Sequence, residues 1–272
     1  MNKEEFFISG FNSKFIGDDG AFIDNFVYSK DLFCEGIHFK REWMSLKEIA
    51  KKSMLVNISD AFSMNAKPKF ALLGIVLPKS VTKVELKEIF NSLKETAKEY
   101  GIEIIGGDTV AGEKLCFSIT IISTTNKPLY RKGLKEGDIF AYSGTLGGVK
   151  KDLTRAFRGG KLGKNSRFKE PILRGDFIFE ASKYMTTALD ISDSLSKDLS
   201  RVCKINRLGV KFFKKLPKSL LCSGEEYEVL FSFNKRNLTK IESIAKKHRV
   251  KITPFGMAVR GKYKTVCKEN HF

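Results

Sequence analysis

The positions of six aspartates suggest a chemical function more than a structural one. They fall in turns, after strands or inside an apolar helical pattern: Asp19, Asp31, Asp60, Asp108, Asp190 and Asp193. Taken singly, Asp19 suits a tight turn, Asp108 a hairpin and Asp193 a helix N-cap. Asp60 is harder to explain in this way, because a carboxylate within an apolar helix is costly to bury unless a cation or several donors compensate it.

Taken together, these acids predict one shared cation site in a chain whose net charge is +18. A site built from oxygen ligands favours Mg²⁺ or Mn²⁺ over Zn²⁺. The three histidines, His38, His248 and His271, lack the spacing of zinc ligands. Since Mg²⁺ commonly bridges protein carboxylates and nucleotide phosphates, the pattern indicates a metal-assisted nucleotide site.

A glycine-rich segment, SGTLGG at 143–148, is a second candidate for binding phosphate. Its backbone N–H groups can form an anion-binding nest. The segment has neither the Walker pattern of P-loop enzymes nor the glycine spacing of dinucleotide-binding proteins. The motifs of protein kinases are also absent from the chain. The segment alone therefore indicates no more than a turn.

The elements that must position these residues follow from hydrophobic periodicity and helix-end signals. Residues 46–66 are predicted to form the helix that carries Asp60, and residues 82–100 a helix that begins with a capping box. The remaining predicted helices are 176–187, 193–204 and 235–247. The predicted strands are 21–28, 70–77, 102–105, 115–124, 139–142, 209–213, 227–233 and 250–255, with a turn at 106–109 between the third and fourth.

The order of these elements mixes hairpin-like and helical connections, so we expect an α+β fold with two halves rather than one doubly wound sheet. The length of 272 residues allows one large or two medium domains. A boundary is predicted near the segment 126–138, which divides the chain into domains 1–132 and 133–272.

Composition limits the class of protein. Hydrophobic residues make up 42% of the chain, enough for a sizeable core. The first residues do not read as a signal peptide, and no apolar run is long enough to cross a membrane, so a soluble, cytoplasmic protein is expected. The five scattered cysteines are expected to be reduced thiols. The positive charge favours a polyanionic partner, but it is spread out and does not by itself indicate nucleic-acid binding.

The motifs, in their order along the chain, resemble the thiamine-monophosphate kinases. This family shares a fold with aminoimidazole ribonucleotide synthetase and selenophosphate synthetase. The resemblance covers nearly the whole chain and rests on IGDD at 16–19, SKD at 29–31, EGIHF at 35–39, VNISD at 56–60, AKP at 66–68, GGDT at 106–109, RKGLKEGD at 131–138, SGTLG at 143–147, DISD at 190–193 and SGEEYE at 223–228.

The resemblance implies an enzyme that transfers phosphate from ATP to thiamine monophosphate, with several Mg²⁺ ions. It implies a two-domain, aminoimidazole ribonucleotide synthetase-like fold, in which the N-terminal domain binds ATP and Mg²⁺ and pairs with a second copy through its sheet. The implied metal ligands are Asp19, Ser29, Asp31, Asp60, Asp108, Asp190 and Asp193, of which Asp190 and Asp193 are catalytic. The implied ATP contacts are Gly107, Asp108, Arg131 and Ser192, and the implied contacts to thiamine monophosphate are His38 and Glu225.

The chain departs from the family pattern at several places. The family usually has Ser-Thr-Asp at 29–31, Asp-Gly-Leu at 193–195 and Gly-Gly-Glu-Asp-Tyr-Glu at 223–228, where this chain has SKD, DSL and SGEEYE. A lysine within 29–31 would add a cation to the metal shell. Relatives also place an aromatic residue near the C-terminus to face the substrate, and Phe272 and Trp43 are the candidates to replace it here.

Three other functions remain open at this level. A sister enzyme of the superfamily is one, although selenophosphate synthesis would need a reactive Cys near the N-terminus and the first Cys here is Cys34. The substitutions at Lys30, Ser194 and Glu226 motivate a catalytically silent binder of nucleotide or thiamine phosphate. A nucleic-acid-binding protein is motivated only by the net charge, and a steep salt dependence of binding would support it.

Overall fold

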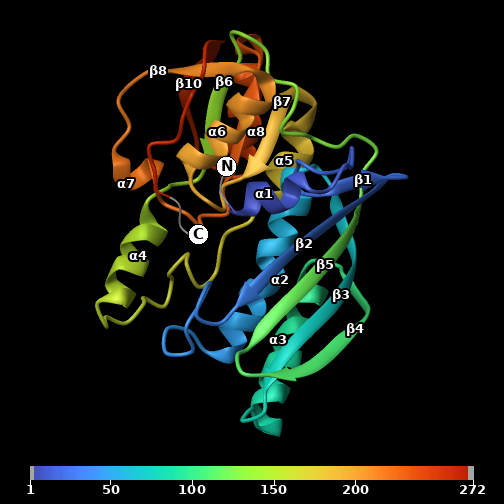
Figure 1. Cartoon of the computed structure of the whole chain (residues 1–272). Coiled ribbons are helices and arrows are strands. Elements are labelled where there is room, and N and C mark those ends of the chain that lie inside the picture. Colours follow the sequence, from blue (N-terminus) through green and yellow to red (C-terminus); the bar gives the residue numbers. More distant parts are fainter. Residues whose placement is uncertain (1–2, 269–272) are drawn as a thin grey trace.

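Two five-stranded sheets, one from each half of the chain, form the framework of the molecule (Figure 1). The structure is a computed structural model that describes residues 3–268. The first sheet lies within residues 21–124 and the second within residues 139–260. The expected α+β fold with two halves is confirmed. The boundary at residue 132 lies in the connection between the sheets, and its status as a domain boundary remains a prediction.

The N-terminal half holds the sheet in the order β1-β2-β5-β3-β4. Its elements are α1 (Lys3–Ser9), β1 (Ala21–Ile23), β2 (Phe26–Cys34), α2 (Leu46–Ser63), β3 (Lys67–Pro78), α3 (Lys83–Glu99), β4 (Glu103–Gly112) and β5 (Cys116–Thr124). Strands β3 and β4 are parallel, as a connection through helix α3 requires, and the other pairs are antiparallel. Helices α2 and α3 cover one face of this sheet (Figure 1).

The C-terminal half holds an antiparallel sheet in the order β7-β9-β6-β10-β8. Its elements are β6 (Ile139–Ser143), α4 (Gly148–Phe157), α5 (Gly175–Ala181), η1 (Ser182–Tyr184), β7 (Met185–Asp190), α6 (Leu195–Asn206), β8 (Leu208–Phe212), α7 (Lys218–Leu221), β9 (Val229–Phe233), η2 (Lys235–Asn237), α8 (Leu238–Lys247) and β10 (Ile252–Arg260). No helix of the described residues is long and apolar enough to cross a membrane.

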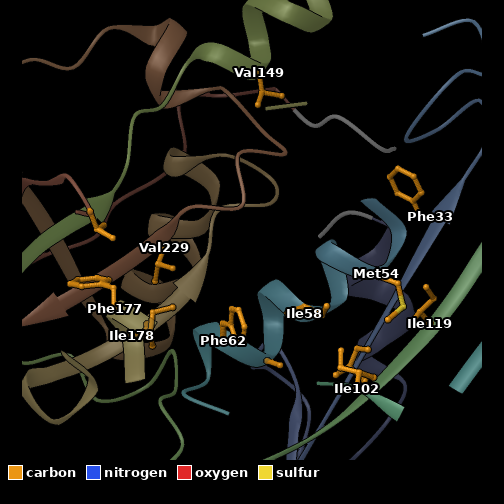
Figure 2. Packing of buried hydrophobic residues seen from close by; sticks show 14 of the residues in the cluster. Phe33, Met54, Ile58, Phe62, Ile102, Ile119, Val149, Phe177, Ile178 and Val229 are labelled. Atoms are coloured by element: carbon orange, nitrogen blue, oxygen red, sulfur yellow. The ribbon is translucent and has the colours of Figure 1, made fainter. Parts of the chain in front are cut away.

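Helix α2 is the central element because both halves pack against it. It begins at a capping box, in which the Ser45 side chain accepts from the Glu48 N–H and Glu48 accepts from the Ser45 N–H. Figure 2 shows Ile58 and Phe62 of this helix between side chains from the first half, such as Ile119, and side chains from the second half, such as Phe177. From Lys52 to its end at Ser63, every residue of α2 is buried, polar side chains included.

One predicted element is wrong in type and two are wrong in extent. The single strand predicted at 21–28 is a hairpin, because β1 ends at Ile23 and β2 begins at Phe26. The segment 106–109 is not a turn, because β4 continues through it and pairs with β3. Its glycines allow a close approach, since a Cβ on Gly107 would lie 1.9 Å from the Leu73 carbonyl oxygen. The helix predicted at 176–187 ends at Ala181, and its last residues belong to β7. Pairing with β9 overrides the local helical pattern there.

The expectation of five reduced thiols is also wrong. Disulfide bonds join Cys34 to Cys116 and Cys222 to Cys267, while Cys203 is a buried free thiol. Cys34 and Cys116 are direct cross-strand partners of β2 and β5, although 82 residues separate them in sequence. Pairing of this kind depends on strand register, which the spacing of the cysteines does not reveal.

Candidate active site

Three of the six aspartates meet at the junction of the two halves. Carboxylate oxygens of Asp19, Asp60 and Asp190 all lie within 4.8 Å of one another, and we call these three residues the acidic cluster. Asp19 comes from the loop before β1, Asp60 from α2 and Asp190 from the end of β7. Asp60 and Asp190 are buried, with 8% and 3% of their surface exposed. Three segments distant in sequence therefore bring these three acids together, and the cation site shared by all six stays a prediction.

The electrostatics of this cluster suit a divalent cation. Burial, and then the neighbouring carboxylates, raise the pKa of Asp60 and of Asp190 well above the usual range. The pKa of Asp31 rises to about 6, chiefly through burial and then through Asp19 and Asp193. Carboxylates held so close repel one another, and a bound dication removes that repulsion. The all-oxygen donor set fits Mg²⁺.

Hydrogen bonds fix the cluster in place. The Ser59 hydroxyl donates to the Asp190 carboxylate at 2.8 Å, and the Ser63 hydroxyl donates to Asp19. The Asp190 backbone N–H also donates to the Asp19 carboxylate, at 3.2 Å. Both serines lie on α2, so the helix that supplies Asp60 also orients the other two acids.

One residue of α2, Asn57, forms hydrogen bonds with both Ser29 and Asp31 of β2. The Asp31 backbone N–H donates to the Asn57 side-chain oxygen at 2.7 Å. The Ser29 hydroxyl donates to the Asn57 backbone carbonyl at 3.1 Å, and Ser29 is buried. Asn57 thus couples the predicted ligands of β2 to the helix that bears Asp60.

Basic side chains line the same cavity, which has a volume of about 660 Å³. Arg131 binds Asp19 through Nε at 3.1 Å and Nη2 at 2.5 Å, and its backbone N–H donates to Asp18 at 2.6 Å. Lys197 and Arg201, both on α6, also line the cavity. The lining therefore combines acids with cations, which is the charge pattern of a site for metal-bound phosphates.

Asp193 and Ser192 stand at the cavity beside the start of α6. Asp193 forms ion pairs with Arg201 and, at 3.8 Å, with Lys197. It is not the helix cap, because that position belongs to Ser194, whose side chain accepts from the Lys197 N–H. The serine that replaces the usual glycine of the family therefore has a structural role, and Asp193 lines the cavity.

Two predicted site residues lie far from the acidic cluster within one chain. Gly107 on β4 pairs with Leu73 on β3, which pairs with Ile119 on β5, which pairs with Asp31 on β2. Three strand spacings of about 4.8 Å place Gly107 roughly 14 Å from β2. Asp108 follows it on the same edge strand and is exposed. The structure does not bring Gly107 or Asp108 into the cavity of its own chain.

The two residues predicted to bind thiamine monophosphate belong to a second group of side chains. The His38 ring accepts from the Cys34 backbone N–H through Nδ1, at 3.0 Å, and stacks on Phe33. Glu225 forms an ion pair with Lys52 of α2 at 2.8 Å. The Lys52 ammonium also lies 5.4 Å from the centroid of the Phe33 ring, so His38 and Glu225 are linked through Phe33 and Lys52.

Lys52, Lys197 and Arg201 are site residues that the sequence reasoning missed. A signal for Lys52 exists, because it stands three residues after Ile49 and four before Val56, on the buried stripe of the predicted helix. Surface lysines seldom interrupt such a stripe. Lys197 and Arg201 have no such signal, because the sequence does not distinguish them from the other cations among its 49 Lys and Arg residues.

The remaining departures from the family pattern have definite places in the structure. The Lys30 ammonium donates to Ser118 at 2.7 Å on the neighbouring strand, although its side chain also borders the cavity. Trp43 packs edge-on against Phe157 and Phe168. Phe272, the other candidate for the substrate-facing aromatic, lies outside the described residues.

The fold and the acidic cluster indicate the general class of protein. Residues 17–125 match the family model of the AIR synthase related protein, N-terminal domain. The solved structure described as AaThiL complexed with AMPPCP and TMP has a TM-score of 0.88 with this chain at 23% identity, covering 99% of this chain and 96% of that one. The chain therefore has the aminoimidazole ribonucleotide synthetase-like fold.

Sequence similarity then gives the particular family. The thiamine-monophosphate kinase of Leptospira interrogans is 33% identical over 229 residues, which are 75% of this chain and 74% of the relative. The thiamine-monophosphate kinase of Buchnera aphidicola subsp. Schizaphis graminum is 31% identical over 273 residues, 89% of this chain and 84% of the relative. The chain belongs to the thiamine-monophosphate kinase family.

Proposed function

We propose that this protein phosphorylates thiamine monophosphate to thiamine diphosphate with ATP as the donor. The observation that carries the proposal is the convergence of Asp19, Asp60 and Asp190 in a cavity that cationic side chains also line. Such a cavity suits the transfer of a phosphoryl group between two polyanions. The relatives named above support the choice of thiamine monophosphate as the acceptor.

The roles of the site residues are part of this proposal. Several Mg²⁺ ions would be held by seven residues: Asp19, Ser29, Asp31, Asp60, Asp108, Asp190 and Asp193. Bound Mg²⁺ would neutralise phosphate charge and align the two phosphates. Arg131 and Ser192 would contact ATP together with Gly107, and His38 and Glu225 would contact thiamine monophosphate.

The reaction needs no general base from the protein. The attacking group is a phosphate oxygen, and the second pKa of a phosphate monoester is about 6, so it is largely ionised near neutral pH. The protein has to position the acceptor and reduce the repulsion between the reacting phosphates. Arg131, Lys197 and Arg201 lie where they can pair with phosphate oxygens at the cavity wall.

A homodimer accounts for the position of Gly107 and Asp108. Both residues lie on the edge strand β4, and their own acidic cluster is beyond their reach. The apolar side chains Leu32, Leu72 and Ile105 are exposed on the same sheet, with exposed fractions of 38–56%. We propose that the sheets of two copies pair through this face, and that β4 of each copy brings Gly107 and Asp108 to the cavity of the other.

A cytoplasmic location is also part of the proposal, because ATP is the phosphate donor. The two disulfide bonds are the structural observation against it, since such bonds are rare in reducing compartments. A count of free thiols in the purified, unreduced protein decides whether these two bonds form.

The test is ADP release by the purified protein with Mg²⁺ and ATP, in the presence and absence of thiamine monophosphate. ADP release that requires thiamine monophosphate, and is matched one for one by thiamine diphosphate, is the expected result. A folded protein that binds Mg·ATP but shows no substrate-dependent release would contradict the proposal.

A further inference from the structure

Lys52 is a fully buried cation. It belongs neither to the acidic cluster nor to the lining of the cavity around that cluster. Its ammonium lies 2.8 Å from Oε2 of Glu225 and 3.6 Å from the centroid of the Phe168 ring. Burial lowers the pKa of Lys52, and the Glu225 carboxylate acts in the opposite direction. A lysine buried this completely needs a carboxylate partner, so the ion pair is a fixed feature of the fold.

The backbone of Glu225 is fixed by contacts with Ser192 and Asp193. Its backbone is in the left-handed region, at φ +54°, and its N–H donates to the Ser192 carbonyl at 2.7 Å. The preceding Gly224 packs so closely that an added Cβ would lie 2.7 Å from the Asp193 carbonyl oxygen. These contacts place the Glu225 backbone directly beside the two residues proposed to act on ATP and metal.

The ion pair changes what Glu225 can recognise. Lys52 occupies Oε2 and balances the negative charge, while 17% of the Glu225 side chain remains exposed. A neutral pair attracts a cation weakly, but the second carboxylate oxygen still accepts a hydrogen bond. Thiamine monophosphate offers both kinds of partner, because its thiazolium ring is cationic and its aminopyrimidine ring carries an N–H donor.

We propose that Lys52 is a positioning residue that neutralises Glu225 and presents its free oxygen, Oε1, to the amino group of the aminopyrimidine. Glu225 then recognises the substrate as a hydrogen-bond acceptor and not as the counter-ion of the thiazolium. This inference rests on the proposed function, because it concerns the acceptor site of the same reaction.

The alternative role of Glu225 predicts opposite results for the same variants. If Glu225 were the counter-ion of the thiazolium, loss of the Lys52 charge would strengthen the attraction and tighten substrate binding. If Glu225 is a neutral acceptor, loss of Lys52 leaves an uncompensated carboxylate that is free to turn away, and binding weakens.

The experiment compares Lys52→Met, Glu225→Gln and the double variant with the matched control Lys51→Met. Lys51 is the adjacent lysine, and its ion pairs with Glu99 and Glu170 lie away from Glu225. For each protein, the KM for thiamine monophosphate, the KM for Mg·ATP and the thermal unfolding temperature are measured. The double variant replaces a buried ion pair with neutral side chains of similar size, a change that folded proteins generally tolerate.

The expected result is a split between the two substrates. Lys52→Met raises the KM for thiamine monophosphate about tenfold or more, because the unpaired Glu225 carboxylate no longer holds its oxygen toward the substrate. The KM for Mg·ATP changes by less than about threefold, and Lys51→Met leaves both values near those of the unmodified protein. The double variant regains most of the lost affinity, because the neutral amide that Glu225→Gln introduces keeps an acceptor oxygen and needs no counter-charge.

Two results would overturn the inference: an unchanged or lower KM for thiamine monophosphate in Lys52→Met, or a double variant that binds this substrate no better than Lys52→Met. Calorimetric titration of thiamine monophosphate without ATP separates this question from the proposed function. If the unmodified protein binds the compound but does not phosphorylate it, the proposed function fails and the dissociation constants of the series still decide the role of Lys52. If the unmodified protein does not bind it, both proposals fail.

Discussion

Burial distinguishes the aspartates of the acidic cluster from most acids of the chain. Asp60 and Asp190 are buried among other carboxylates, and burial together with these neighbours raises the pKa of both groups. Asp193 differs from them, because Arg201 and Lys197 already balance its charge. Replacement of Asp193 therefore tests its role in catalysis with little disturbance of the buried acids.

Asp193→Asn is expected to reduce turnover by at least about 100-fold, because even residues that only support a metal ligand typically cost 10–100-fold when mutated. The unfolding temperature should change little, since the side chain keeps its size. Steady-state ADP release and thermal unfolding measure the two effects.

The matched control is Asp176→Asn, the same substitution at an exposed aspartate of α5. It should leave turnover near that of the unmodified protein. Near-normal turnover in Asp193→Asn would remove this residue from the proposed metal site.

The cysteines give a prediction that needs no mutation. Burial raises the pKa of the Cys203 thiol to about 12, and the other four cysteines are paired. A thiol reagent at neutral pH should label no cysteine of the native protein, because thiolate formation and access are both suppressed. The same reagent should label one cysteine after denaturation and all five after reduction.

Mass spectrometry of the labelled, unreduced protein identifies the free thiol as Cys203 if the pairing holds. Five labelled cysteines in denatured protein that was never exposed to reductant would contradict both disulfide bonds and remove the observation against a cytoplasmic location.

At the level of elements, helix α2 does more than any other to form the site. It supplies Asp60, orients Asp190 and Asp19 through Ser59 and Ser63, and carries Lys52. Both halves of the chain pack on α2 (Figure 2), and every residue from Lys52 to Ser63 is buried, so the polar side chains of this stretch lie against one half or the other. The helix therefore links the acidic cluster to the residues proposed to bind thiamine monophosphate.

Asn57→Ala tests this linking role. The change removes the acceptor for the Asp31 backbone N–H, which then lies without that hydrogen bond in a largely buried position. The expected loss is about 1–3 kcal/mol of unfolding free energy. Denaturant unfolding measures the loss, and the affinity for Mg·ATP should fall as Asp31 loosens.

Asn91→Ala provides the comparison, since Asn91 lies on α3 away from the cavity. Equal losses of stability in the two variants, with Mg·ATP affinity unchanged in Asn57→Ala, would show that Asn57 does not order the site.

At the level of the whole molecule, the sheet of the N-terminal half presents an exposed apolar face, and β4 bears Gly107 and Asp108 far from their own cavity. A dimer through this face explains both features. It also predicts that each active site draws residues from two chains, so that variants of different residues can complement one another.

Asp108→Asn and Asp193→Asn are each expected to be nearly inactive alone. When the two are mixed under conditions that exchange subunits, activity should rise to about a quarter of that of the unmodified protein, because half of randomly formed dimers are mixed and each has one intact site. ADP release before and after mixing is the measurement, and light scattering determines the oligomeric state.

Asp193→Asn mixed with Asp190→Asn is the control, since both residues border the cavity of the same chain. In every dimer of that mixture, each cavity lacks one of the two acids, so no intact site arises. Equal activity in both mixtures would contradict the two-chain site.

The sequence alone predicted the class of fold, the order of most elements and a shared site for the acids. Hydrophobic periodicity and capping boxes are local signals, so the helices at α2 and α3 were predicted to within a few residues. The positions of the acids predicted one shared site for six aspartates, of which Asp19, Asp60 and Asp190 meet in the acidic cluster. Asp60 in particular was marked by its place in an apolar helix.

Only the tertiary structure decided which residues meet. Strand register pairs Cys34 with Cys116 and separates Asp108 from the cavity of its own chain. The packing of both halves on α2 makes Lys52 a buried partner of Glu225, 173 residues away in sequence. Such contacts depend on how surfaces from distant segments come together, and local patterns of residues carry no information about that.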